Sequence, residues 1–462
     1  MRTGQTRQKK PSNSAFAPRS YQKEGIKFLS RESSGLFLDP GLGKTAIGCQ
    51  ALLNRGSKAL VISSLRIIYE VWPREVAKWK FDLKLATLHG KGKSKNLSPG
   101  ADLYLINYAG LPWLIGQLAQ NKNLLRELGI DTLIVDESTA FKNHRAKTRL
   151  KLLKKHLKKF DYVHIFTGTP TPKGYLDLWA QIYLLDRGEA LGKYFTHYKI
   201  KYFTQLDYMG YEWALRPGAD KEIEDAIKHL VIRFSRDELK DLPPLVDNYI
   251  YVELPTAARK LYLQMERELV IQIQKKEVTA ANAAVASGKC RQLASGSVYD
   301  EEKNTVQVHD AKLEALEELI ESLQGSPLLV LYEYRHEVAK LRAAIGKDTP
   351  YIGSGVKQKE VSSIIDSWNR GEIPVLLAHA GTIAHGLNLQ DSGHNLCWYS
   401  ITWNLEHYQQ AYQRLWRSGQ KHKVINHHIV AKGTIDEVII EVLKNREATQ
   451  NSLLKALEHK LT

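Results

Sequence analysis

A glycine-rich loop between an apolar strand and a helix constrains the fold of this chain more than any other feature of its sequence. The loop, Asp39-Pro-Gly-Leu-Gly-Lys-Thr45, follows the strand pattern Gly35–Leu38 and leads into a helical pattern. Such a turn lets backbone N–H groups close around phosphates, while its lysine reaches the β and γ groups and its threonine hydroxyl can bind Mg²⁺. The sequence therefore predicts a nucleoside triphosphate site that contains Gly41, Leu42, Gly43, Lys44, Thr45 and Ala46.

A second motif helps to decide between a nucleotide site and a plain glycine turn. The strict pattern G-x-x-x-x-G-K-[ST] fails at its first position, which is Leu38, so the plain turn is the alternative. However, residues 131–137 form a buried strand pattern that ends in two carboxylates. Asp136 is predicted to hold Mg²⁺, and Glu137 to orient and deprotonate the attacking water. A strand-end Asp-Glu pair alone is common, but together the two motifs predict an NTPase.

Short apolar strands alternate with longer helical patterns along most of the chain, which is typical of parallel α/β architecture. We predict strands at 35–38, 59–63, 101–107, 132–135, 162–166, 328–331, 374–378, 395–399 and 424–430. Between about 175 and 300 strands become rare, so we expect helical material between two α/β lobes. The predicted parts are a flexible basic arm (1–17), a first lobe (18–235), a helical insertion or linker (236–305), a second lobe (306–445) and a C-terminal helix (446–462).

The charge balance indicates a polyanionic partner. Lys and Arg number 66 against 50 Asp and Glu, which gives a net charge of +16, although charge alone does not identify the partner. No apolar run approaches the roughly 18–20 residues that a membrane span needs. Three distant cysteines form neither a disulfide framework nor a zinc cluster. We therefore expect a soluble, intracellular protein with no membrane partner and no structural metal site.

Two arginines near the end of the chain complete the predicted catalytic machinery. If residues 406–420 are helical, Gln410, Arg414 and Arg417 lie at i, i+4 and i+7 on one face. A two-lobed enzyme needs positive charge from its second lobe at the γ-phosphate held by the first, and such arginine fingers can raise the rate by about 10³–10⁵. A solvated arginine pair on a surface helix is the alternative.

Taken in order from residue 18 to 440, these motifs resemble those of the Swi/Snf family, which are DEAD/DEAH-like helicase ATPases of superfamily two. The matching segments are Pro18–Gln22, Asp39–Thr45, Asp136–Asn143, Thr167–Pro170, Leu176–Trp179, Asp241–Pro244, Cys290–Leu293, Gly381–Gln390, Gln410–Gln420 and Gly433–Glu437. Ser138-Thr139 departs from the usual Ala-His after the acidic pair, which puts the family's interlobe contact in doubt. The other departures remove no group that the ATPase chemistry requires.

The resemblance implies two RecA-like P-loop NTPase lobes, with ATP between them, Mg²⁺ as the metal and duplex nucleic acid across both. It also implies roles for further residues: nucleotide binding by Arg19, Gln22 and Gly386, coupling of nucleotide state to nucleic acid by Thr167 and Thr169, and catalysis by Lys44, Glu137, Gln410, Arg414 and Arg417. Arg414 and Arg417 would be the arginine fingers.

Contacts with nucleic acid are predicted to be with backbone phosphates only, because no residue pattern indicates reading of base edges. Residues 142–159 contain nine Lys and Arg and no acidic residue, but a solvated helix face is an equal alternative there. The candidate contacts follow strand ends or the acidic pair: Ser63, Asn107, Tyr108, Lys142, Asn143, Ser354 and Thr382.

The leading prediction is a DNA-stimulated ATPase that translocates on duplex DNA as a monomeric motor. A strand-separating DNA or RNA helicase is the alternative among enzymes. A nucleic-acid-binding scaffold that no longer hydrolyses ATP belongs to another class, which the intact catalytic residues disfavour. A motor subunit with a protein partner such as a nuclease is also open. The compact chain favours a bacterial or phage source, and hence the cytoplasm and nucleoid of a bacterial or phage-infected cell; a eukaryotic source would indicate the nucleus.

Overall fold

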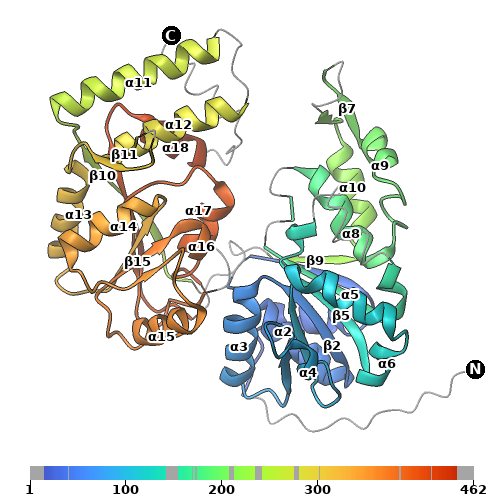
Figure 1. Cartoon of the computed structure of the whole chain (residues 1–462). Helices are drawn as coiled ribbons and strands as arrows, with labels where there is room; N and C mark the ends of the chain where they lie inside the picture. The colour runs from blue at the N-terminus through green and yellow to red at the C-terminus, as the bar shows by residue number, and fades with distance from the viewer. Residues whose placement is uncertain are drawn as a thin grey trace, which may run out of the picture. The chain divides into compact units, whose positions relative to one another are not determined.

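A computed structural model describes residues 15–39, 41–141, 155–168, 170–171, 174–207, 213–234, 242–274, 280–300, 302–383, 387–417 and 419–444 of the chain. The chain forms two compact units, Met1–Lys240 and Asp241–Thr462. Each unit is built around its own parallel sheet (Figure 1). No helix in the described ranges has the length and apolar character that crossing a membrane requires.

Seven parallel strands form the sheet of the first unit, in the order β3-β4-β2-β5-β6-β1-β9. They are β1 (Ser34–Leu38), β2 (Lys58–Ser63), β3 (Leu85–Thr87), β4 (Leu103–Asn107), β5 (Ile130–Asp136), β6 (Tyr162–Thr167) and β9 (Val231–Phe234). The central strands are buried on both faces and therefore read as continuous apolar runs. Side chains alternate between the faces, since Leu36 and Leu38 belong to one core cluster and Phe37 to the other.

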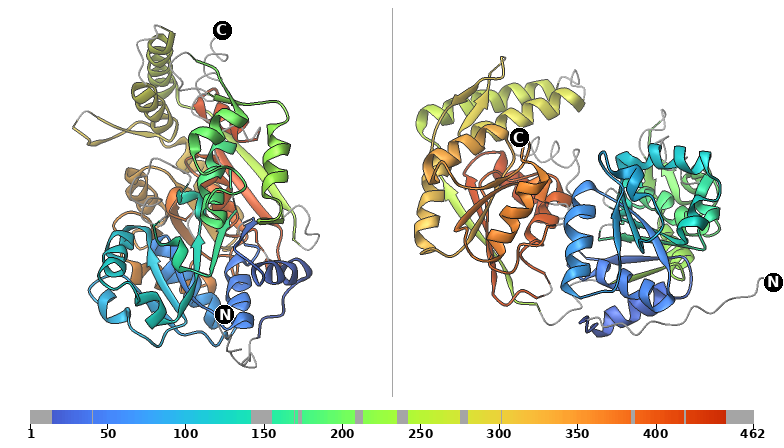
Figure 2. Two further views of the ribbon diagram at one scale, coloured as in Figure 1. Left: turned by 90° about the vertical axis from the view of Figure 1, so that its right-hand side faces the viewer. Right: turned by 60° about the horizontal axis from the view of Figure 1, so that its bottom comes forward.

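Helices cover both faces of this sheet, as the two further views in Figure 2 show. One face carries α1 (Ser20–Leu29), α2 (Lys44–Arg55) and α3 (Trp72–Lys78), which follows the π-helical turn η1 (Ile67–Val71). The other carries α5 (Leu111–Gln120), α6 (Leu124–Leu128) and α8 (Leu178–Asp186). The helices α9 (Phe195–Tyr202), which contacts α8, and α10 (Ala219–Ile227) add residues to the same core. The remaining elements are α4 (Lys93–Asn96), the 3₁₀ turns η2 (Tyr108–Gly110), η3 (Ser138–Phe141), η4 (Leu157–Lys159) and η5 (Tyr175–Asp177), and an antiparallel pair, β7 (Phe203–Gln205) and β8 (Trp213–Leu215).

The second unit contains six parallel strands in the order β10-β17-β16-β13-β15-β14. They are β10 (Leu245–Val252), β13 (Leu328–Tyr332), β14 (Tyr351–Ile352), β15 (Val375–His379), β16 (Asn395–Trp398) and β17 (Val424–Ala431). The helices are α11 (Thr256–Gln274), α12 (Ala280–Ala294), α13 (Ala311–Ser322), α14 (Arg335–Ile345), α15 (Gln358–Asn369), α16 (Ala380–Ile383), α17 (Leu405–Tyr412) and α18 (Ile435–Lys444). A small antiparallel pair, β11 (Ser297–Tyr299) and β12 (Thr305–Gln307), completes the unit.

The observed sheets confirm the predicted fold class, which is two parallel α/β lobes of the P-loop NTPase type. All nine predicted strands are present, with bounds that differ by no more than two residues. These strands were predictable because their burial on both faces demands an uninterrupted apolar run.

The segment 236–305, expected to be a helical insertion or linker, also contributes a strand to the second sheet. β10 pairs in parallel with β17 over eight residues, from Leu245↔Val424 to Val252↔Ala431. It is an edge strand with a half-exposed sequence, and its partner lies 179 residues further along the chain, so no local pattern marks it. The division into units falls after Lys240, and the other predicted domain limits stay predictions.

Part of the expected basic arm packs on the first unit. The backbone N–H of Ala15 donates to the carbonyl of Trp79 at 2.9 Å, and Phe16 is buried with its ring centroid 5.1 Å from that of Trp79. Residues 1–14 and the predicted C-terminal helix 446–462 lie outside the described residues.

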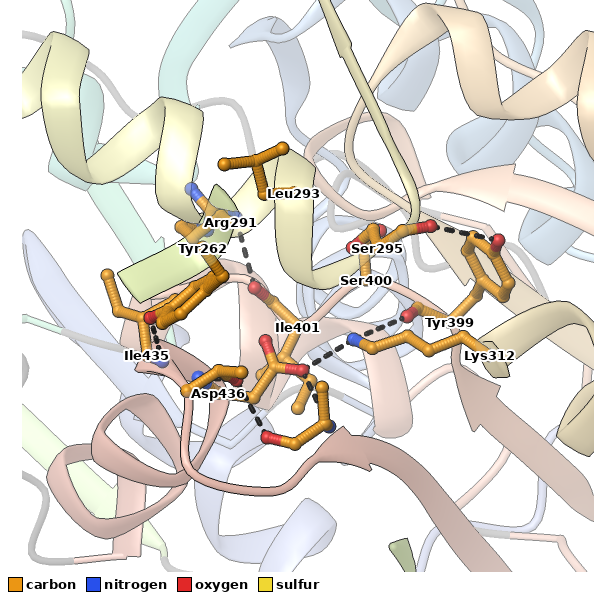
Figure 3. A network of polar contacts seen from close by, with 12 residues as sticks. Tyr262, Arg291, Leu293, Ser295, Lys312, Tyr399, Ser400, Ile401, Ile435 and Asp436 are labelled. Carbon is orange, nitrogen blue, oxygen red and sulfur yellow. Dashed lines mark hydrogen bonds and ion pairs between the residues drawn. The ribbon is translucent and has the colours of Figure 1, made fainter. Parts of the chain in front are cut away.

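A buried polar network ties α12 and α13 into the second unit, as Figure 3 shows. Lys312 of α13 is fully buried, and its ammonium lies 2.6 Å from the Asp436 carboxylate and donates to the carbonyl of Tyr399 at 3.2 Å. Arg291 of α12 donates to the carbonyl of Ile401 at 3.0 Å. These contacts fix α12 and α13 to α18 and to the segment that follows β16.

We expect Lys312→Met to destabilise the second unit by about 3–5 kcal/mol, because the buried Asp436 carboxylate loses its partner. The double variant Lys312→Met/Asp436→Leu should recover much of this loss, since no unpaired charge remains. Urea denaturation of the full chain followed by circular dichroism measures both effects. Arg370→Ala is the control, because its ion pair with Glu372 is more than half exposed and should matter little. Equal losses for Lys312→Met and Arg370→Ala would contradict the structural role.

Candidate active site

The phosphate-binding loop lies between β1 and α2, as predicted. Gly41 and Gly43 have φ angles of 89° and 81°, a region that residues with side chains rarely adopt. A Cβ atom on Gly43 would lie only 2.7 Å from Nε2 of Gln22. Helix α2 begins at Lys44, so its first N–H groups and the positive end of its dipole adjoin the loop. This cradle of backbone without side chains fits the phosphates of a nucleotide.

Residues of α1 brace the loop. The Gln22 amide donates from Nε2 to the carbonyl of Leu42 at 3.2 Å, and the Tyr21 hydroxyl donates to the same carbonyl at 3.1 Å. The N–H of Arg19 in turn donates to Oε1 of Gln22 at 2.9 Å. Gln22 is buried, so its amide is held between the start of α1 and the loop. Arg19, Gln22 and Leu42, predicted from different motifs, therefore lie together.

The acidic pair stands at the end of β5. Asp136 is buried, and its Oδ2 accepts a hydrogen bond of 3.0 Å from the indole N–H of Trp72, while its Oδ1 accepts one of 3.1 Å from the N–H of Glu137. Glu137 is half-buried, with a φ of 57°. The hydroxyl of Tyr108 donates to the carbonyl groups of both acidic residues.

Burial makes Asp136 a weak acid. Loss of solvation, followed by the nearby charge of Glu137, raises the pKa of the Asp136 carboxyl to about 7, although the Lys44 ammonium opposes the shift. Lys44 itself donates from Nζ to the carbonyl of Leu38 at 2.7 Å. A buried carboxyl group with a raised pKa fits a divalent cation, which would supply the positive charge that this site lacks.

The order of the strands brings these groups to one edge of the sheet. β5, β6 and β1 are neighbours, and all three are parallel. Thr167, the last residue of β6, pairs with Phe37 of β1, and Phe166 pairs with Asp136. The carboxyl ends of parallel strands are where α/β sheets bind ligands. The loop, Thr167 and Asp136 therefore meet at this edge, whereas Thr169 lies outside the described residues.

Gln181 of α8 is a connecting residue that the sequence did not reveal. It is fully buried, accepts a hydrogen bond of 2.6 Å from the Ser138 hydroxyl, and donates to the carbonyl of Pro170 at 2.7 Å. Ser138, one of the two departures after the acidic pair, thus links that pair to the segment after β6. Ser138 and Gln181 are 43 residues apart in the sequence, so only covariation of the two positions among relatives could have indicated the contact.

The predicted arginines of the second unit lie beyond the helix expected to carry them. Helix α17 ends at Tyr412, so Gln410 is helical while Arg414 and Arg417 stand in the turns that follow. Arg414 is 5% exposed and donates from Nε to the carbonyl of Gln410 at 3.0 Å. Both guanidinium groups reach the carbonyl of Leu387 at 3.5 Å. The three predicted residues are therefore close together, and Gly386 lies outside the described residues.

The predicted contacts with nucleic acid fall in different environments. Ser354 is exposed, whereas Asn107, Tyr108 and Thr382 are half-buried and Ser63 is fully buried. Lys142, Asn143 and most of the basic run lie outside the described residues. Each contact stays a prediction.

Comparison with known proteins assigns the family. A model of the SNF2-related domain matches residues 21–302, and a model of the helicase conserved C-terminal domain matches residues 311–419. The chain belongs to the SNF2 family. This membership confirms the resemblance drawn from the motifs. It also makes the chain an ATP-binding, nucleic-acid-binding hydrolase of helicase superfamily two.

This SNF2-family chain is similar to proteins and solved structures that include the following. It is 34% identical to protein p41 of Acyrthosiphon pisum secondary endosymbiont phage 1, covering 96% of this chain and 99% of that protein. It is 25% identical to the uncharacterized ATP-dependent helicase MG018 of Mycoplasma genitalium, but spans only 41% of that protein's length. The Sulfolobus solfataricus SWI2/SNF2 ATPase core in complex with dsDNA matches at 22% identity over 96% of this chain and 95% of that one, with a TM-score of 0.43.

Proposed function

We propose that this SNF2-family protein hydrolyses ATP in order to move along duplex DNA. The observation that carries the proposal is the joint position of the phosphate-binding loop, Thr167 and Asp136 at the carboxyl ends of three adjacent strands. A binding scaffold without catalysis would not need the acidic pair, the loop lysine and the second-unit arginines together.

In this proposal each residue has a defined task. Lys44 and the loop N–H groups hold the phosphates, and Thr45 and Asp136 bind Mg²⁺, which neutralises phosphate charge. Glu137 orients and deprotonates the attacking water. Arg414 and Arg417, supplied by the second unit, stabilise the charge that develops on the transferred phosphoryl group.

One observation favours duplex over single-stranded nucleic acid, and a second favours contacts with a phosphate backbone. Single-strand binders present exposed aromatic rings on which bases stack. Three tryptophans near the second-unit motifs instead pack within that unit. Trp398 is fully buried and donates to Asn426. Trp416 donates to the carbonyl of Pro243 at 2.7 Å, and Trp403 packs against the core. The net charge of +16 suits a phosphate backbone.

The test is the rate of ATP hydrolysis without nucleic acid and with duplex DNA, single-stranded DNA or RNA. We expect duplex DNA to stimulate most, and Lys44→Ala to hydrolyse no ATP under any condition, because the β and γ phosphates lose their cation. Displacement of a third strand from a triplex without separation of the duplex would support translocation. Strongest stimulation by RNA would contradict the duplex assignment, separation of the duplex would favour a helicase, and no stimulation would favour a scaffold.

A further inference from the structure

Tyr108 joins two strands of the first unit that are not neighbours. It follows β4, whereas the acidic pair follows β5, and β2 lies between these strands in the sheet. The phenolic oxygen lies 2.5 Å from the carbonyl oxygen of Asp136 and 2.9 Å from that of Glu137. The phenolic O–H of Tyr108 is therefore shared between the two carbonyl groups on either side of the Glu137 Cα atom. The ring is fixed edge-on against the buried Phe141, with centroids 5.8 Å apart.

Glu137 needs such support because its backbone is strained. Its φ of 57° lies in the left-handed region, which a residue with a side chain adopts only when its surroundings hold it there. Local bonds contribute, since the N–H of Glu137 donates to Asp136 and its carbonyl accepts from the N–H of Ala140 at 3.0 Å. The bonds from Tyr108 come from a distant element and constrain the peptide groups on both sides of the Glu137 Cα atom.

We propose that Tyr108 is a positioning residue that holds Glu137 in the backbone conformation required for water activation. The inference rests on the proposed function, because it takes Glu137 to be the group that activates water. A carboxylate displaced by about 1 Å can lose up to about 100-fold in rate, since proton transfer needs a short and aligned contact. Tyr108 therefore acts on the reaction without touching a reacting atom.

The same side chain gives the end of β4 a direct mechanical connection to the catalytic pair. Asn107, the neighbouring residue, caps the turn η2 by accepting a hydrogen bond of 3.1 Å from the N–H of Gly110. Asn107 is also a predicted contact with the nucleic-acid backbone. If a phosphate binds this turn, Tyr108 would connect the nucleic-acid contact to the backbone of Glu137.

The test compares Tyr108→Phe with Tyr104→Phe in the full chain. Tyr104 lies on β4, the strand that precedes Tyr108, is fully buried, and donates its phenolic proton to the carbonyl of Ser98 at 2.8 Å, away from the acidic pair. We expect Tyr108→Phe to lower kcat by about 10- to 100-fold, with KM for ATP and Tm close to the values of Tyr104→Phe. Tyr104→Phe should keep the wild-type kcat. Stimulation of ATP hydrolysis by nucleic acid should be weaker than in wild type for Tyr108→Phe but unchanged for Tyr104→Phe.

The outcomes separate this inference from the proposed function. If the wild-type chain hydrolyses ATP and Tyr108→Phe keeps the same kcat, the inference is wrong and the proposed function stands. A fall in kcat of the same size in both variants, or one that follows a matching fall in Tm, would also overturn it, because the phenol would then be merely structural. A wild-type chain that hydrolyses no ATP would overturn the proposed function and the inference with it.

Discussion

Glu137→Gln is expected to lower kcat for ATP hydrolysis by about 10²–10⁴-fold while ATP binding stays unchanged. The substitution keeps the size of the side chain and its backbone conformation but removes the group that accepts a proton from water. The loop from Gly41 to Lys44, which holds the phosphates in the proposed function, is not altered. Steady-state hydrolysis with duplex DNA measures kcat, and fluorescent nucleotide titration measures binding.

A carboxylate on the same strand but at its opposite end provides the matched control. Asp131 stands at the amino end of β5, where its Oδ1 accepts a hydrogen bond of 2.8 Å from the Thr132 hydroxyl. Asp131→Asn removes one negative charge from β5 without touching the acidic pair, so its kcat should stay near that of wild type. If Glu137→Gln and Asp131→Asn hydrolyse ATP equally fast, Glu137 is not the catalytic base.

Structure and site residues could be predicted wherever the determining pattern lies within a short, continuous segment of the sequence. The continuous apolar run of β5 and the glycine turn after β1 are local, so fold class, strands and loop residues followed from short segments. Edge strand β10 escaped prediction because most of its residues are only partly buried or exposed, in no alternating pattern, and its partner strand is remote in sequence. The helix expected through residue 420 ended at Tyr412, since periodicity does not mark the turn in which Arg414 bonds to Gln410.

The residues that support the acidic pair could not be predicted from the sequence, for a different physical reason. Trp72 lies 64 residues before its partner Asp136, Tyr108 lies 28 residues before it, and Gln181 lies 43 residues after Ser138. Each is an ordinary polar or aromatic residue whose role depends on tertiary position alone. A sequence identifies the groups that do chemistry by their type and spacing, but the groups that hold them in place can come from any strand end.

Arg417→Ala is expected to lower the DNA-stimulated kcat by about 10³–10⁵-fold, if the second unit supplies this guanidinium to the γ-phosphate. The loss should appear equally in kcat and kcat/KM, because a finger stabilises charge that exists only in the transition state. Arg417 is a sharper choice than Arg414. Arg414 is 5% exposed and donates from Nε to the carbonyl of Gln410 in addition to the Leu387 carbonyl that both arginines reach, so its removal would also cost a buried hydrogen bond.

Two further variants distinguish a catalytic effect of Arg417→Ala from a loss of folding. Arg370→Ala removes an arginine from the surface of the same unit and should leave both kcat and Tm unchanged. Arg417→Lys keeps one positive charge but loses the planar fork, so it should recover only a small part of the rate. An Arg417→Ala protein that hydrolyses ATP at the wild-type rate would exclude it as a finger. A loss of rate with wild-type Tm and nucleotide affinity would support a role for Arg417 in the transition state of hydrolysis.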